Sequence, residues 1–131
     1  MDIRLEEYVQ EDGSSPYQAW FNGLDAQAAA KITVAKTRLE LGNTSNVEWF
    51  RGIGEYKIDW GPGYRIYLAK DGEALIILFG GSTKKAQQKA IDQAVVLHDE
   101  YKARKKIIAT ARKGKNYDAD QRFQADRCCA C

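Results

Sequence analysis

Basic side chains recur at short intervals through the middle of the chain. They are Arg51, Lys57, Arg65, Lys84 and Lys85, and Tyr67 follows Arg65 by two residues. Guanidinium and ammonium groups bind phosphate, and a guanidinium can do so through two parallel hydrogen bonds. Fixed cations that face a developing negative charge stabilise a transition state, and a lysine crowded by other cations can act as a base. These residue types are suited to binding a phosphodiester and cleaving it.

The motifs of several other chemistries are missing from the sequence. It contains one histidine and no G-x-S-x-G, so a hydrolase triad is not expected. It has no glycine-rich P-loop and no Cys/His metal spacing before the last four residues. Cys128, Cys129 and Cys131 have no histidine near them, which makes a poor zinc set. We therefore expect neither a metal nor another cofactor.

Three consecutive strands are predicted to position the cations. Glu55–Trp60 alternates in polarity, Gly61-Pro62-Gly63 forms a tight turn, and Tyr64–Ala69 continues as a second strand. Asp71-Gly72 predicts a hairpin before Ala74–Phe79, a nearly all-apolar strand that belongs inside a sheet. The three strands form an antiparallel meander.

The alternation of these strands determines which side chains share a face. Lys57 and Arg65 flank the Gly61-Pro62-Gly63 turn at similar distances, so both can lie on one face, and Tyr67 shares that face. The alternative for Arg65 is a solvent-facing position paired with Asp59 or Glu55.

The remaining elements complete an α+β fold. Asp2–Val9 predicts an edge strand, and Ser15-Pro16 begins a short helix. A second helix is predicted over Ala26–Leu41, and a long C-terminal helix from Lys84 to about Lys106. We expect the N-terminal strand and helical hairpin to pack on the meander. We expect residues 1–105 to form the domain and residues 106–131 to form a basic extension that is either partly disordered or folds on a partner.

Composition and charge favour a single domain with a polyanion-binding side. The 131 residues are 44% hydrophobic, and no apolar stretch reaches the ~20 residues of a membrane span. The N-terminus is unlike a signal peptide, so a cytoplasmic location is expected. Residues 1–50 carry a net charge of −4 and residues 51–131 a net charge of +6. This asymmetry suits a face that binds nucleic acid, but it can equally reflect solvated charges on the last helix and tail.

An ordered set of segments gives the chain a family resemblance. The set consists of Gly54-Glu55-Tyr56-Lys57-Ile58, Gly61-Pro62-Gly63-Tyr64-Arg65-Ile66-Tyr67, Asp71-Gly72, Leu75–Leu78, Gly80-Gly81 and Lys84. It resembles the RelE/ParE superfamily of bacterial toxins, most closely the HigB-like, phage Gp49-like branch, over residues 1–105. The resemblance implies a RelE-like fold and the toxin of a type II toxin–antitoxin system. Such toxins are metal-independent endoribonucleases (mRNA interferases) that cleave mRNA, typically on the ribosome, and so inhibit translation.

The resemblance also implies roles for individual residues. Arg65, Lys57 and Lys84 match catalytic positions, although Lys57 stands where arginine is usual and Ala90 where aspartate is common. Arg51, Lys85 and Tyr67 are candidate RNA-binding residues; the first two can also be plain surface charges, and Tyr67 can simply pack. The implied partners are mRNA, the ribosome and a cognate antitoxin, possibly of the helix-turn-helix type, and no membrane. Two alternatives stay open: a ParE-like inhibitor of DNA gyrase, or a catalytically inactive binding module of the same fold.

Overall fold

The computed structural model describes residues 3–118. In chain order its elements are β1 (Arg4–Glu7), α1 (Pro16–Asn22), α2 (Ala26–Glu40), β2 (Val47–Phe50), β3 (Ile53–Ile58), β4 (Tyr64–Lys70), β5 (Leu75–Thr83), the 3-10 turn η1 (Lys84–Ala86) and α3 (Gln87–Asp118). The chain divides into two units, Met1–His98 and Asp99–Cys131, so α3 begins in the first and continues into the second. The sheet, its core and the site described below belong to the first unit.

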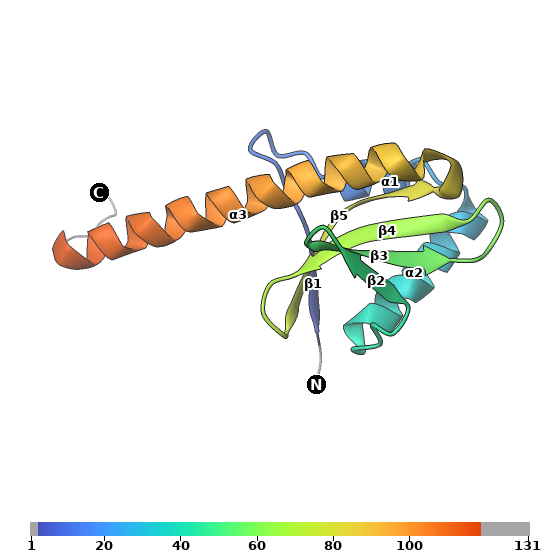
Figure 1. The fold of residues 1–131 in the computed structure, drawn as a ribbon, viewed down its shortest axis with the longest axis horizontal. Helices are drawn as coiled ribbons and strands as arrows, with labels where there is room; N and C mark the ends of the chain where they lie inside the picture. The colour runs from blue at the N-terminus through green and yellow to red at the C-terminus, as the bar shows by residue number, and fades with distance from the viewer. Residues whose placement is uncertain (1–2, 119–131) are drawn as a thin grey trace. The chain divides into compact units, whose positions relative to one another are not determined.

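The strands form one mixed sheet in the order β1-β5-β4-β3-β2 (Figure 1). β1 lies at one edge and pairs parallel to β5, while the other neighbouring strands pair antiparallel. The predicted α+β class and the antiparallel meander are confirmed, but the sheet has five strands rather than the three of the meander. The meander β3-β4-β5 is extended on one side by β1 and on the other by β2. No strand is predicted at Val47–Phe50, because these four residues do not alternate in polarity.

Local side-chain bonds start both helices of the hairpin where the sequence predicts. The Ser15 hydroxyl accepts a hydrogen bond from the backbone N–H of Gln18 at 3.1 Å, and the Asp25 carboxylate accepts one from that of Ala28 at 2.8 Å. Each bond satisfies a helix N–H that has no partner within the helix. The buried stripe of α2 repeats at helical spacing and consists of Ala28, Ile32, Ala35 and Leu39.

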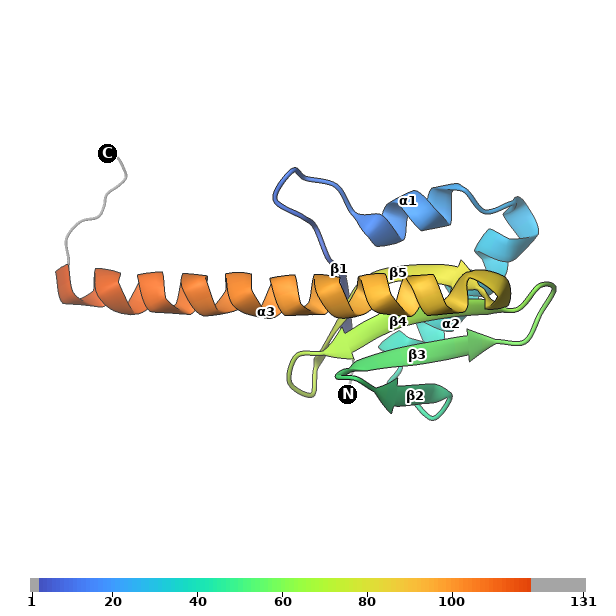
Figure 2. The same cartoon turned by 45° about the horizontal axis from the view of Figure 1, so that its top comes forward.

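The two faces of the sheet differ in chemistry. One face is apolar and packs against α1 and α2; it includes Tyr56, Ile66, Leu68, Ile76 and Leu78. The opposite face carries polar residues of β3 and β4 and lies beneath the first turns of α3 (Figure 2). Because successive strand residues point to opposite faces, Glu55 and Lys57 of β3 share this face with Arg65 and Tyr67 of β4, and the buried apolar Ile53 and Ala69 lie beside them.

The C-terminal helix differs from its predicted bounds. A 3-10 turn precedes it, and α3 continues to Asp118, well beyond Lys106. The first part of the predicted extension is therefore helical. The rest of that extension, with its three cysteines, lies outside the described residues. Among the helices described, none is both long enough and apolar enough to cross a membrane.

Candidate functional site

Arg65 is a buried cation, and two of its three guanidinium nitrogens have no partner among the described residues. Its residue is only 6% exposed, and its Nε and Nη1 have no hydrogen-bond partner among the described residues. Neither Asp59 nor Glu55 forms an ion pair with it within that part of the chain. Leaving a buried donor unsatisfied costs roughly 1–3 kcal/mol, so nearly all such groups in proteins are paired. Both nitrogens are buried and unpaired, so each can donate to an anion that reaches the guanidinium.

Lys57 lies beside Arg65 on the same face of the sheet. The two residues are direct partners in the antiparallel pairing of β3 and β4. The Lys57 Nζ is 3.0 Å from Oε1 of Glu48 and 4.0 Å from Oε1 of Glu55, and its side chain is 43% exposed. Lys57 therefore reaches solvent next to Arg65, with two carboxylates that partly offset its charge.

Gly63 brings Lys84 to the same end of the sheet. The Lys84 N–H donates to the Gly63 carbonyl at 2.9 Å, which ties η1 to the turn between β3 and β4. A Cβ atom at position 63 would lie 3.1 Å from Nη1 of Arg65 and 3.5 Å from Cβ of Lys84, and Gly63 has a φ of +80°. Glycine is thus required both by the turn and by the close approach of Arg65. Arg65, its strand partner Lys57 and the backbone of Lys84 lie at this end of the sheet, and we call the three residues the Arg65 cluster.

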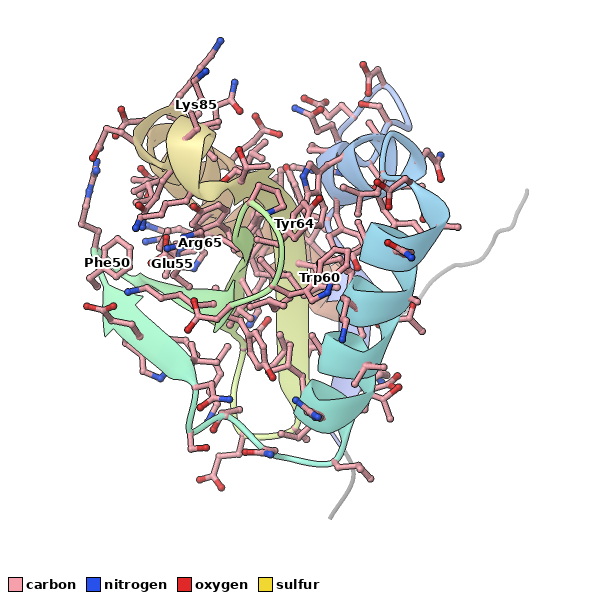
Figure 3. The ribbon with its side chains drawn as sticks, turned by 90° about the vertical axis from the view of Figure 1, so that its right-hand side faces the viewer. Phe50, Glu55, Trp60, Tyr64, Arg65 and Lys85 are labelled. Atoms are coloured by element: carbon pink, nitrogen blue, oxygen red, sulfur yellow. The ribbon has the colours of Figure 1, made fainter. Side chains whose placement is uncertain are left out.

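Glu55 is a member of this layer that the sequence analysis treated only as a possible counter-ion. It is 1% exposed, and Nε2 of Gln87, at the start of α3, donates to its Oε2 at 2.8 Å. Figure 3 shows Glu55 and Arg65 together on one side of the β3–β4 hairpin. The signal that points to Glu55 is its position two residues before Lys57, in a strand covered on both faces. Its carboxylate links α3 to the strand that carries Lys57.

Tyr67 lies below the surface rather than on it. Its residue is 1% exposed, and its hydroxyl and that of Ser82 are 3.1 Å apart in a hydrogen bond. Burial, with a further contribution from Glu55, raises the pKa of Tyr67 to about 12, so the hydroxyl keeps its proton at neutral pH. No ring face is open to a nucleotide base in this structure. Tyr67 supports the layer beneath Arg65.

The two remaining candidates lie outside the Arg65 cluster. Arg51, beyond the opposite end of β3 from Lys57, places Nη1 3.0 Å from Oδ1 of Asp92 in an exposed ion pair. Lys85 is exposed and points away from Arg65 (Figure 3). The backbone thus places Arg65, Lys57 and Lys84 at one end of the sheet, while Arg51 is paired with Asp92 elsewhere and the Lys85 side chain points away.

Histidine and metal chemistry were not expected in this protein. His98 packs against Phe79, with ring centroids 5.5 Å apart, as a histidine at the core edge does. Among the residues that the structure describes, no three His, Cys, Asp or Glu side chains group in a way that could hold a metal ion.

Comparison with known proteins gives one relative. A protein of Haemophilus influenzae described as "Uncharacterized protein" is 38% identical over 86 residues, which make up 64% of this chain and 87% of that protein. No family model and no solved structure matches the chain.

Proposed function

The chain belongs to the same family as this uncharacterized Haemophilus influenzae protein, and from the geometry around Arg65 we propose that it is a RelE-like, HigB-like toxin that cleaves mRNA. One observation carries the proposal: a buried guanidinium with two unused donors lies beside two further cations. A structural arginine at this depth would be hydrogen-bonded, whereas a phosphate-binding arginine keeps unpaired donors until its ligand arrives.

The cluster supplies what cleavage by internal transfer needs. The 2′-oxygen of a ribose attacks the adjacent phosphorus, the bond to the 5′-oxygen breaks, and the products are a 2′,3′-cyclic phosphate and a 5′-hydroxyl. Arg65 stabilises the charge that develops on the phosphoryl oxygens. Lys57 or Lys84 takes the 2′-hydroxyl proton, and the other cation binds phosphate and supplies a proton to the leaving oxygen.

The arrangement of elements agrees with this proposal. The antiparallel strands β3, β4 and β5 present the cluster at one end of the sheet, and the fixed Gly63 turn sets the distance between its members. The partners in this proposal are the translating ribosome with its mRNA, in the cytoplasm, and an antitoxin that covers the cations.

Cleavage of mRNA in a translating extract tests the proposal. Purified protein is added, and the 5′ ends of the mRNA are mapped. New ends at defined codon positions are expected with the wild-type protein, and Arg65→Ala should reduce them by about 10²-fold or more, as loss of a transition-state donor does. Arg65→Lys should be intermediate, because it keeps the charge but loses two-point binding. Lys89→Ala, on the exposed face of α3 away from the cluster, is the matched control and should cleave normally.

The same experiment separates the rival functions. Intact mRNA together with accumulated gyrase–DNA complexes would replace the nuclease with a ParE-like inhibitor. If neither activity is found with folded protein, the chain is an inactive binding module, a role that would fit the pairing of Lys57 with Glu48. Thermal unfolding of each variant checks that a lost activity is not lost folding.

A further inference from the structure

A groove with no assigned role runs between α2 and the free end of β3. It has a volume of about 490 Å³ and is lined by residues of both elements and of the segment that follows β3. β2 pairs with β3 only as far as Tyr56, so the edge of β3 at Lys57 and Ile58 has no neighbouring strand on that side. The groove lies at this uncovered edge.

Two cations of α2 line the groove and have no counter-ion. Lys31 and Arg38 are both exposed, and neither forms an ion pair within the described part of the chain. They are seven residues apart, two turns of the helix, so they share one side of α2 and lie about 10 Å from each other along its axis. The carboxylate on the groove wall is Asp59. Two cations at this separation can contact an extended polyanion at more than one phosphate.

Aromatic rings form the end of the groove nearest the β3–β4 turn. Trp60 lines the groove and stacks on Tyr64, with centroids 6.1 Å apart, and Nζ of Lys31 lies 5.6 Å from the centre of the Trp60 ring. Trp60 and Tyr64 lie between the turn and α2 in Figure 3. A basic groove with aromatic residues on its wall is typical of sites that bind single-stranded nucleic acid.

The groove and the Arg65 cluster meet at the uncovered edge of β3. Lys57 lines the groove, and its direct strand partner Arg65 lies on the face of the sheet opposite to α2. A strand of RNA with one phosphate at Arg65 would round this edge at Lys57 and continue along α2. We propose that this groove is a second binding site, which holds the single-stranded RNA that flanks the cleaved linkage. The inference rests on the proposed function, because that function identifies the linkage that is cleaved. Binding of RNA in the groove does not itself require cleavage.

Binding of RNA of two lengths tests this site without any cleavage. The probes are a fluorescent single-stranded 2′-O-methyl RNA of about eight nucleotides, a length within the usual range of such sites, and a dinucleotide. The dinucleotide carries the same 2′-O-methyl modification, so neither probe has the 2′-hydroxyl that would attack the phosphorus. The test variant is Lys31→Ala/Arg38→Ala. The control is Arg4→Ala/Lys89→Ala, which removes the same charges from exposed positions on β1 and α3, outside the groove.

The groove variant should bind the longer RNA about tenfold more weakly and the dinucleotide as the wild type does. The slope of log K against log salt should fall by about 1.4, because each lost phosphate contact on a single strand contributes about 0.7. The control variant should keep the wild-type slope and affinity. Equal weakening in both variants, or none in the groove variant, would overturn the inference. So would a groove that binds an acidic peptide in place of the RNA.

The outcome is separable from that of the cleavage experiment. If Arg65→Ala still cleaves mRNA while the groove variant loses affinity for the longer RNA, the proposed catalytic role fails and the groove survives as an RNA-binding site. If Arg65→Ala abolishes cleavage and the groove variant binds the longer RNA normally, the catalytic role of Arg65 stands and the groove is not an RNA-binding site.

Discussion

The unused donors of Arg65 make a prediction about stability. A ligand that binds only the folded protein stabilises it, by about 1.4 kcal/mol at ten times its Kd. Inorganic phosphate should therefore raise the free energy of unfolding of the wild-type protein more than that of Arg65→Met. Urea unfolding, in phosphate and in chloride at equal ionic strength, measures the difference. The comparison between proteins is needed because phosphate is excluded from protein surfaces and stabilises folded proteins generally.

A matched variant keeps this test specific. Lys89→Met removes an exposed cation from α3 and should respond to phosphate as the wild type does. If Arg65→Met gains as much from phosphate as the wild type, the guanidinium does not bind the anion. The buried donors would then be a plain cost to stability.

The sequence predicted where Arg65 points but not how deeply it lies. Alternation along two strands joined by a tight turn was enough to place Lys57 and Arg65 on one face, and the register confirms it. The burial of Arg65 could not be predicted, because it depends on which elements cover that face. The same holds for Glu55, whose bond to Gln87 joins residues far apart in the chain.

At the scale of elements, Gly81 fixes how α1 packs on β5. A Cβ atom at this position would lie 2.5 Å from the ring of Trp20. Gly81→Ala should therefore destabilise the protein by about 1–3 kcal/mol, the usual range for overpacking. Gly23→Ala is the matched control, because its Cβ would meet only two backbone carbonyls, at 3.5 and 3.9 Å, and its φ is −85°. The urea unfolding midpoints of Gly81→Ala and Gly23→Ala, each compared with that of the wild type, measure the two losses of stability.

A second substitution distinguishes the Trp20 contact from a backbone effect. In Gly81→Ala/Trp20→Leu the smaller side chain leaves room for the new methyl group. The double variant should then be less unstable than the two single losses added together, with a coupling of about 0.5–3 kcal/mol. Simple additivity would mean that Trp20 is not what excludes alanine at position 81.

The elements that could be predicted are those with local signals. Ser15 and Asp25 cap their helices through hydrogen bonds from the residue three positions later in the chain, so the start of each helix can be predicted from local sequence. β2 is stabilised by its pairing with β3, and its four residues are too few to show a periodic pattern of polar and apolar residues in the sequence. The groove was missed for a related reason. Its cations Lys31 and Arg38 belong to the half of the chain whose net charge is negative, so a count along the sequence hides them.

At the scale of the whole molecule, the division after His98 predicts which part of the chain is sufficient for function. The Arg65 cluster, the groove beside α2 and the apolar core all lie within the first unit. A chain that ends at residue 105 should therefore keep the urea midpoint, the phosphate-dependent gain and the mRNA cleavage of the full protein. A chain that ends at residue 90 also loses Ile91 and Ala94, which are buried, and the contact of His98 with Phe79. Burial of a large apolar side chain contributes about 1.5–3 kcal/mol, and this contribution is lost together with the cover over Phe79, so this shorter chain should be much less stable. If the chain ending at residue 105 folds and binds phosphate but no longer cleaves, residues 106–131 take part in the activity, and the functional domain is larger than the first unit.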